Sequence, residues 1–377
     1  MTENPFLIKG YKSPDYFCDR KNETEVLMSN IANGADTTII APRKYGKSGL
    51  ILHTFYNIEK EGLPFVSIYV DILATLTLND FIKALADAIL TKFPEKTILG
   101  DRFMNLIRSL RPTLSHDSMT GQPQVEFNFM NETQQQHTLK SLLEFLNNQE
   151  KKVVLAIDEF QQITEYPEKN VEALLRSYMQ QMHNVRFIYS GSKRAIMTEM
   201  FLQASRPFFS STRTLSIGRI EPGVYASFIR SHFKKIEVMV DDEAMNQILE
   251  WTKCHTFYTQ SLCNAIYAMR PERVTLDVVN EACNGILERE TAYYLQYREM
   301  LTTQQWRILI GIAKEDSVRR LTSSEFLTKY KIGSATNCRR AVESLVKKEL
   351  ILEIVGLQQT EYSIYDVFFS RWLRKNY

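Results

Sequence analysis

The chain of 377 residues is longer than one ordinary hydrophobic core requires, so we expect two or three domains. Its 44% hydrophobic and 24% charged residues are typical of a folded protein and exclude a chain disordered by composition. The 46 Lys and Arg residues nearly balance the 44 Asp and Glu residues, and the net charge of +2 gives no overall sign of nucleic-acid or membrane binding.

The N-terminal stretch MTENPFLIKGYKSPDYF lacks the continuous apolar segment of a signal peptide, and no later apolar run is long enough to span a bilayer. We therefore expect a cytoplasmic protein that does not associate with membranes. The cysteines are odd in number and form no Cys-x-x-Cys pair, which argues against a disulfide framework or a zinc site. They are Cys18, Cys254, Cys263, Cys283 and Cys338.

The stretch TTIIAPRKYGKSGL, residues 37–50, has the three parts of a phosphate-binding loop: a short β-branched strand, a basic loop and the start of a helix. Gly46 permits close approach of the backbone to phosphate, Lys47 can reach the β- and γ-phosphates, and the Ser48 hydroxyl can bind Mg²⁺. We expect the helix to run from Gly49 to about Gly62. The expected phosphate-binding residues are Pro42, Arg43, Lys44, Tyr45, Gly46, Lys47, Ser48 and Gly49.

Ala41 stands where this motif usually opens with glycine. A left-handed backbone conformation at an alanine would cost on the order of 1 kcal/mol, because its only side-chain atom is a methyl carbon. The alanine therefore does not disqualify the loop. We expect it to bind ATP or ADP together with Mg²⁺.

A second apolar strand, in KKVVLAIDEFQQI at residues 151–163, ends in two adjacent carboxylates. Open α/β sheets bind their ligands at the carboxyl ends of the strands. There Asp158 would hold Mg²⁺, directly or through water, and Glu159 would polarise an attacking water molecule. The alternative is an Asp-Glu pair that only caps a helix after a core strand.

Polar residues also end two further predicted strands. The stretch VRFIYSGSKRAIM ends its strand with Ser190 and Ser192, whose hydroxyls could sense the γ-phosphate or orient the water. Serine is also common at strand ends without such a role. Asp71 closes the strand FVSIYVDI and is a further candidate for a role near the metal.

The segment between Lys47 and Asp158 is long for one helix and one strand. It contains an Asp-x-x-Thr-Gly-x-Pro sequence that predicts a turn, and the alternation of Val125, Phe127 and Phe129 with polar residues predicts a half-buried strand. We expect a β-hairpin insertion at about residues 110–130. It is either a plain exposed hairpin or a contact surface for a partner or a second copy.

After residue 220 the pattern is helical, and DDEAMNQILEWTK predicts a helix that begins at an acidic cap. The last segment predicts three helices and a two-stranded ribbon, which together make a winged helix. Its third helix, capped at Ser334, would present Arg339 and Arg340 to DNA. Residues 301–377 contain 13 Lys and Arg against 8 Asp and Glu, a modest basic bias that also suits an intramolecular module.

Five stretches in this order resemble the archaeal-type ATPase family, within the STAND and AAA+ P-loop NTPases: FCDRKNETEVL, APRKYGKS, VVLAIDEFQQI, FIYSGSKRAIM and YSIYDVFFSRWL. The resemblance covers nearly the whole chain and implies an α/β fold with ATP bound between core and lid. The implied domains are a P-loop NTPase core with a mainly parallel sheet at 1–220, a helical lid at 221–298 and a winged-helix domain at 299–377.

The match gives Lys47 and Ser48 the Walker A roles, Asp158 and Glu159 the Walker B roles, and Ser190 or Ser192 the sensor role. Arg20 would lie near the adenine, although Asp19 replaces the glycine of the family pattern. Ser211 stands where relatives often carry arginine, with Arg206 and Arg213 nearby in other registers. His255 lacks the proline of the family's lid turn, and would either contact phosphate or pack among aromatic rings.

The resemblance thus implies a slow Mg²⁺-dependent ATPase that acts as a nucleotide-driven switch or motor. Its catalytic residues would be Glu159, Lys47 and Ser192. The alternatives are a nucleotide-regulated DNA-binding protein and a nucleotide-binding scaffold without turnover. Expected partners are a second copy of the chain, DNA, or an unidentified protein.

Overall fold

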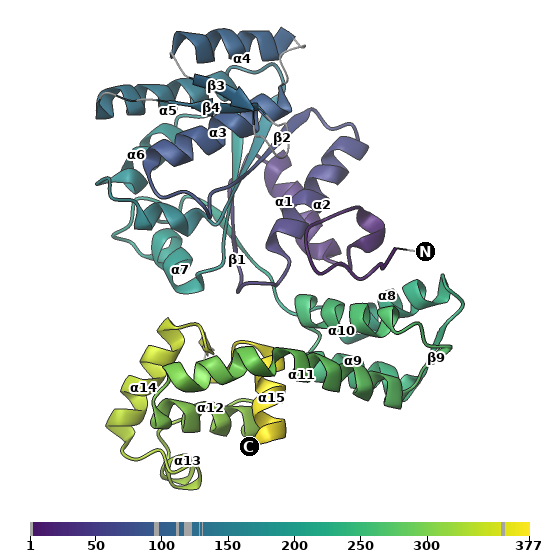
Figure 1. Ribbon diagram of the computed structural model, residues 1–377. Coiled ribbons are helices and arrows are strands. Elements are labelled where there is room, and N and C mark those ends of the chain that lie inside the picture. Colours follow the sequence, from purple (N-terminus) through teal and green to yellow (C-terminus); the bar gives the residue numbers. More distant parts are fainter. Residues whose placement is uncertain are drawn as a thin grey trace. The chain divides into compact units, whose positions relative to one another are not determined.

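The computed structural model describes residues 3–93, 98–110, 113–116, 123–127, 129, 131–355 and 359–377. The chain divides into two compact units (Figure 1). Residues 9–218 form the first, here called the core unit. Residues 1–8 and 219–377 form the second, here called the helical unit.

The core unit is built on a five-stranded sheet with the order β2-β5-β6-β1-β7, in which all pairings are parallel. Its strands are β1 (Thr37–Ile40), β2 (Phe65–Asp71), β5 (Lys152–Asp158), β6 (Val185–Gly191) and β7 (Arg213–Ser216). The predicted α/β class with a mainly parallel sheet is confirmed. The register pairs Asp71 with Asp158 and Ile40 with Gly191, so the carboxyl ends of four strands meet at one edge.

Helices cover both faces of this sheet, and Figure 1 shows α1 and α2 on one face and α3, α5, α6 and α7 on the other. Alternate residues of β5 explain why, because Leu155 and Ile157 belong to one apolar cluster while Val154 and Ala156 belong to the other. The helices of the core unit are α1 (Lys21–Ala32), α2 (Lys47–Lys60), α3 (Leu78–Lys92), α4 (Ile98–Ser109), α5 (Glu132–Asn147), α6 (Val171–Met179) and α7 (Arg194–Leu202), with short 3₁₀ turns η1 (Pro14–Tyr16) and η2 (Phe160–Glu165).

A hairpin of two antiparallel strands, β3 (Thr113–His116) and β4 (Pro123–Glu126), lies between α4 and α5 in the chain. The second strand ends at Glu126, earlier than the predicted alternation, although the rings of Phe127 and Phe129 stack with centroids 5.5 Å apart. The predicted turn at residues 117–122 lies outside the described residues. A docking role for the hairpin stays a prediction.

The part of the helical unit that follows the core unit in the chain has four helices and a pair of two-residue strands. These are α8 (Pro222–Lys234), α9 (Asp242–Thr252), α10 (Thr256–Ala268), α11 (Leu276–Met300), β8 (Met239–Val240) and β9 (Arg273–Val274). The parallel β8–β9 pair was not predicted. Asp241 precedes α9 as expected, but its side chain does not cap the helix; it accepts a charged contact of 2.6 Å from Arg273. Among the described residues, no helix combines the length and apolar character that crossing a membrane requires.

The C-terminal part of the helical unit has the predicted three helices and ribbon, followed by a helix that was not predicted as an element. The elements are α12 (Thr303–Glu315), α13 (Ser324–Lys329), α14 (Ala335–Lys347), β10 (Ile351–Val355), β11 (Thr360–Ile364) and α15 (Val367–Asn376). The backbone N–H of Asn337 donates to the Ser334 hydroxyl at 3.3 Å, which confirms the predicted cap of α14.

Aromatic residues join α15 to α11 and α12. The Phe369 ring lies 5.0 Å from Tyr294, and the Trp372 indole N–H donates to the Thr291 hydroxyl at 2.9 Å. At the other end of this unit, the buried Phe6 packs against rings of α8 and α10. Its neighbours are Phe228, His232, Phe233 and Tyr267.

Candidate functional site

The loop between β1 and α2 contains two residues with left-handed backbone conformation, Lys44 with φ of 67° and Gly46 with φ of 90°. No side chain caps the N-terminus of α2, where the first backbone N–H groups have no partner within the helix. Such a terminus attracts anions. The helix begins at Lys47, two residues before the predicted start.

Ala41 does not need the left-handed conformation that the sequence analysis considered. Positive φ values in this loop fall on Lys44 and Gly46, while Ala41 is buried in the apolar cluster of Ile39 and Leu50. The expected cost of about 1 kcal/mol for a left-handed alanine therefore does not arise.

The Lys47 ammonium is held back over the loop that precedes it. Its Nζ donates to the carbonyl oxygens of Ala41 at 3.1 Å and Pro42 at 3.2 Å, and the residue is only 5% exposed. A buried cation at a helix N-terminus adds to the positive potential of the helix dipole. This combination favours a phosphate group as its ligand.

Asp158 gathers hydroxyl groups from three segments of the chain. Its Oδ2 accepts from the hydroxyls of Ser48 at 2.5 Å and Tyr69 at 2.6 Å. Its Oδ1 accepts from the Ser190 hydroxyl and from the Glu159 backbone N–H at 3.0 Å. The aspartate is 2% exposed, so these donors replace the water that would otherwise solvate the carboxylate.

Tyr69 was missed by the sequence analysis, although it lies two residues before Asp71 on the same strand. Burial, together with the charge of Asp158 and the hydrogen bond to it, raises the pKa of the Tyr69 phenol well above its usual value. The phenol therefore keeps its proton and donates to the carboxylate. Alternation along a strand puts residues 69 and 71 on one face, which is the signal that could have identified it.

The Ser48 hydroxyl and the Asp158 carboxylate form the hard-oxygen pair that suits Mg²⁺. The two residues predicted as metal ligands are thus in direct contact. Within the described ranges, no group of three or more His, Cys, Asp or Glu side chains could hold a metal ion. Mg²⁺ does not need such a group, because it usually takes one or two protein oxygens and completes its shell with substrate phosphates and water.

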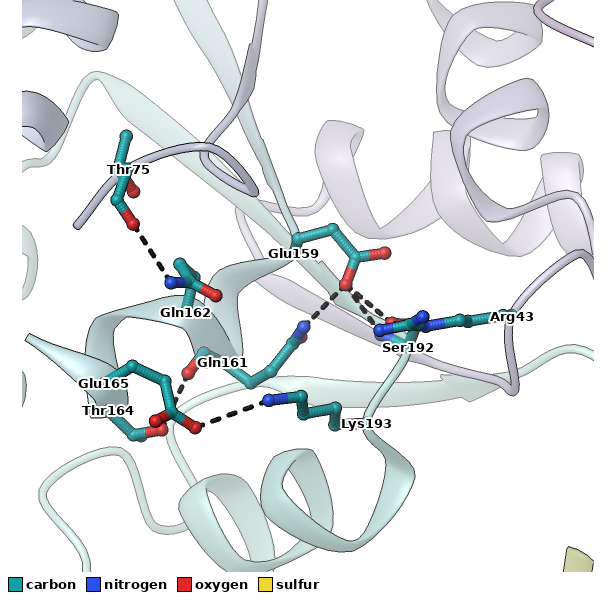
Figure 2. Close-up of polar contacts among 9 residues, drawn as sticks. All are labelled: Arg43, Thr75, Glu159, Gln161, Gln162, Thr164, Glu165, Ser192 and Lys193. Atoms are coloured by element: carbon teal, nitrogen blue, oxygen red, sulfur yellow. Dashed lines mark hydrogen bonds and ion pairs between the residues drawn. The ribbon is translucent and has the colours of Figure 1, made fainter. Parts of the chain in front are cut away.

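Glu159 follows with a left-handed backbone, at φ of 56°. Its Oε2 accepts from the Gln161 side-chain amide at 2.5 Å, from the Ser192 hydroxyl at 2.7 Å and from the Ser192 N–H at 3.3 Å. Arg43 Nε donates to the Ser192 hydroxyl at 3.4 Å. Figure 2 shows Gln161 and Ser192 pointing at the same carboxylate oxygen of Glu159.

Gln161 was also missed, although it belongs to the motif that identified Asp158 and Glu159. It is 1% exposed and lies so close to Gly191 that a Cβ there would come within 2.2 Å of the Gln161 Oε1. The glycine between the two sensor-candidate serines thus makes room for the side chain that holds Glu159.

Two other candidates lie nearby in the core unit. Asp71 accepts from the Leu73 N–H at 2.9 Å, and burial, then the charges of Asp158 and Glu159, raise the pKa of its carboxyl group. The backbone of Arg20 is in the left-handed conformation, and its side chain donates to the carbonyl oxygens of Tyr45 at 3.3 Å and Gly218 at 2.7 Å. These bonds tie Arg20 to the phosphate-loop backbone; a contact with adenine stays a prediction.

The family pattern has an arginine at position 211, where this chain has serine. Ser211 and the two nearby arginines form contacts within the core unit. Ser211 donates to the Phe208 carbonyl at 2.7 Å, and Arg213 donates to Asn30 at 2.9 Å. Arg206 forms an ion pair with Glu172 at 2.6 Å. In the helical unit, His255 is buried at the start of α10, where its Nδ1 accepts from the Phe257 N–H at 3.2 Å and its ring lies 4.5 Å from Tyr258. A phosphate contact of His255 stays a prediction.

Residues 292–375 match a family model described as a probable winged helix domain. The chain is similar in structure to the Walker-type ATPase paby2304 of Pyrococcus abyssi, with a TM-score of 0.67 and 16% identity over 98% of this chain and 99% of that one. It is similar to the ORC2 protein of Aeropyrum pernix, solved as ADPNP-ADP complexes, with a TM-score of 0.60 and 13% identity over 99% and 98% of the two chains. For the ORC1 protein of Aeropyrum pernix, solved in complex with DNA, the TM-score is 0.51 and the identity 12% over 99% and 96%. No curated protein matches this sequence.

The fold is therefore that of a P-loop NTPase followed by a C-terminal winged-helix domain. The resemblance to archaeal-type ATPases with a winged helix, which the sequence motifs indicated, is confirmed at the level of the fold.

Proposed function

We propose that this protein binds ATP with Mg²⁺ in the core unit, hydrolyses it slowly and acts as a nucleotide-driven switch. The observation that carries the proposal is the contact between the Ser48 hydroxyl and the buried Asp158 carboxylate, beside the buried Lys47. A buried carboxylate, a hydroxyl and a lysine that converge at the end of a parallel sheet are best explained by binding of a phosphate together with its metal ion.

The roles of the residues follow from their donors and acceptors. The N–H groups at the start of α2 and the Lys47 ammonium would hold the phosphates, while Ser48 and Asp158 would hold Mg²⁺. The metal, when bound, neutralises charge on the phosphate oxygens. Tyr69 fixes the orientation of Asp158 through its 2.6 Å hydrogen bond.

Glu159 is the residue that would orient and deprotonate the attacking water. Three donors already engage its Oε2, and each of them competes with a water molecule for that oxygen. Gln161 or Ser192 would have to release the carboxylate before it can act as a base. This restraint is the reason for proposing slow turnover.

The proposed switch would move the lid and winged-helix segments together. Arg371 of α15 donates to the carbonyl oxygens of Trp251 at 3.0 Å and Glu250 at 2.8 Å, at the end of α9. Lys253 forms an ion pair with Asp316 at 2.7 Å. These contacts fasten the C-terminal domain to the helices before it, so nucleotide exchange would move one body.

ATP binding and turnover by the purified full-length chain test the proposal across a range of protein concentrations. Lys47→Ala should abolish nucleotide binding, and Glu159→Gln should keep binding but lose turnover. Lys60→Ala, at the exposed far end of α2, is the matched control and should behave like the wild type. Turnover that rises faster than linearly with protein concentration would indicate a site completed by a second copy.

Unchanged ATP binding in Lys47→Ala would remove the proposal. Tight binding without turnover at any concentration would favour the scaffold alternative, which the position of Ser211 in place of an arginine also supports. A switch awaiting a protein partner would give the same result until that partner is added.

A second candidate function is DNA binding by the winged helix. Arg339 and Arg340 are both exposed on α14, which packs against α12 through its buried residues. Replacing both by alanine should weaken retention of duplex DNA and reduce the salt dependence of binding. The control replaces Lys234 and Lys235, an exposed pair at the end of α8. Equal retention by both double variants would exclude this surface.

A further inference from the structure

The helical unit contains an open groove of about 580 Å³ between α9, α11 and α15. Its volume is in the range of small-molecule sites. Cationic side chains of α15 and amide side chains of α9 and α11 line it. The proposed function uses Arg371 of this groove only to attach α15 to α9, and it assigns the groove no ligand.

Three cations enter the groove from one helix. Arg371, Arg374 and Lys375 are spaced at i, i+3 and i+4, and therefore share one face of α15. Among the described residues, none of the three forms an ion pair. Asp316, whose charge acts on Arg371, is already paired with Lys253 at 2.7 Å.

Two of these cations are fixed in place by neutral partners. Arg371 donates two N–H groups to the carbonyl oxygens at the end of α9. The Lys375 ammonium donates to the Asn284 side-chain oxygen at 2.8 Å. An ammonium has three donors and a guanidinium five, so both retain donors for a ligand. Burial lowers the pKa of Arg371, the charge of Asp316 opposes this shift, and the nearby Arg374 adds to it.

The other groove residues suit an anion with several acceptor oxygens. Asn280 and Asn284 of α11 bring amide groups to the groove, and Gln247 donates to Asn280 at 3.3 Å. Glu250 is the one carboxylate in the lining, against three cations. Fixed guanidinium and ammonium groups with added amide donors are the arrangement that binds phosphate groups.

We propose that this groove binds a small phosphorylated anion. The ligand would touch α9 and α11 on one side and α15 on the other, so its binding would strengthen the attachment of the winged helix. The exposed basic pair on α14, Arg339 and Arg340, is not part of the groove, and this favours a small molecule over the DNA backbone.

Inorganic pyrophosphate is the probe, and full-length Lys47→Ala protein is the background, because the phosphate loop would also bind pyrophosphate. Binding is measured by titration calorimetry and by the indole ¹H–¹⁵N resonance of Trp251, which lines the groove and is assigned with Trp251→Phe. Pyrophosphate should shift this resonance and bind more weakly as salt rises.

The double variant Arg374→Glu, Lys375→Glu should bind pyrophosphate at least about 10-fold more weakly, since charge-assisted hydrogen bonds contribute about that factor each. The matched control, Arg339→Glu with Arg340→Glu, carries the same charge change and should bind normally. Arg374→Ala alone is the milder variant if the double variant misfolds, and circular dichroism checks folding.

An unshifted Trp251 resonance, or equal affinity in the groove variant and the control, would overturn the proposal. A shift caused by a short DNA duplex but not by pyrophosphate would also overturn it and would assign the groove to nucleic acid. Because all measurements use the Lys47→Ala background, none of these results depends on whether the core unit hydrolyses ATP.

Discussion

The core unit and the helical unit both bury polar side chains, but they pair them differently. In the core unit, the hydroxyls of Ser48, Tyr69 and Ser190 converge on Asp158 alone. In the helical unit, Trp372 bonds to Thr291 and Arg371 to backbone carbonyls, each contact joining two helices. The first arrangement brings several donors to one carboxylate, whereas the second distributes single hydrogen bonds along the contacts between helices.

Burial of a polar group therefore does not by itself identify a functional site. Several donors that share one buried acceptor indicate a ligand-binding site. Without a ligand to bind, each donor could form its hydrogen bond with a separate, less crowded acceptor. Substitutions should therefore cost activity in the core site and stability in the helical unit. The following predictions test that division.

The largest expected effect is on stability in the helical unit. Phe369→Ala should lower the free energy of unfolding of this unit by about 4 kcal/mol, because it removes a fully buried ring that packs on Tyr294 and Trp306. Denaturant unfolding followed by tryptophan fluorescence measures it. Leu295→Ala, at a half-exposed position of α11, should cost less than about 1 kcal/mol. Similar losses for the two variants would contradict the described packing.

The next effect is on turnover, with little change in stability. Asp158→Asn keeps the shape and one acceptor oxygen but loses the charge that would hold Mg²⁺, so ATP turnover should fall about 100-fold or more. The melting temperature should move little. Asp101→Asn, an exposed carboxylate on α4, is the control with the same chemical change. A large drop in melting temperature with turnover retained would make Asp158 a structural residue.

Gly191→Ala should affect both quantities. The new methyl would meet Gln161 Oε1 at 2.2 Å and Met197 Cγ at 2.6 Å, which should cost about 2 kcal/mol of stability. It should also change turnover, because Gln161 can no longer hold Glu159 in the same place. Gly285→Ala is the control in the helical unit, since nothing lies within 4 Å of its Cβ position. Wild-type stability and turnover in Gly191→Ala would show that Gln161 moves freely.

The smallest effect concerns the ion pair between Lys253 and Asp316. Burial of Asp316 opposes its charge, but the hydrogen bond from Lys253 and the nearby cations outweigh burial and lower its pKa below the usual 3.8. Asp316→Asn should cost less than about 1 kcal/mol, because the aspartate is half exposed.

The pH dependence of this effect has a definite sign. A carboxyl group with a lowered pKa stabilises the folded state fully above its unfolded pKa and loses that contribution as the pH falls through its folded pKa. The difference in melting temperature between wild type and Asp316→Asn should therefore be present at neutral pH, begin to shrink near pH 3.8 and disappear only below the lowered folded pKa. A difference that is constant down to acid pH would exclude the ion pair as its cause.

The sequence predicted which residues lie together in the core unit where their proximity follows directly from position in the chain. Strand β1, the loop and α2 are consecutive, so Lys47 and Ser48 could be assigned from spacing alone. Asp158, Ser190 and Ser192 were predictable because each lies at or next to the carboxyl end of a strand, and parallel strands bring these ends to one edge.

What could not be predicted depends on contacts between segments. Tyr69 reaches Asp158 from a neighbouring strand, and Gln161 turns back onto Glu159 through a 3₁₀ turn that no periodicity reveals. The two-residue strands β8 and β9 are too short for an alternating pattern. The place of Phe6 beside Phe233 depends on residues more than 200 positions away.

The packing of the first residues into the helical unit has a mechanical consequence. The chain crosses between the two units twice, after Ile8 and again after Gly218. Gly10, with φ of 70°, and Gly218 lie within two residues of these crossings and have no atoms within 4 Å of their Cβ positions. The N-terminal segment thus adds a second backbone connection between the units to the one after Gly218.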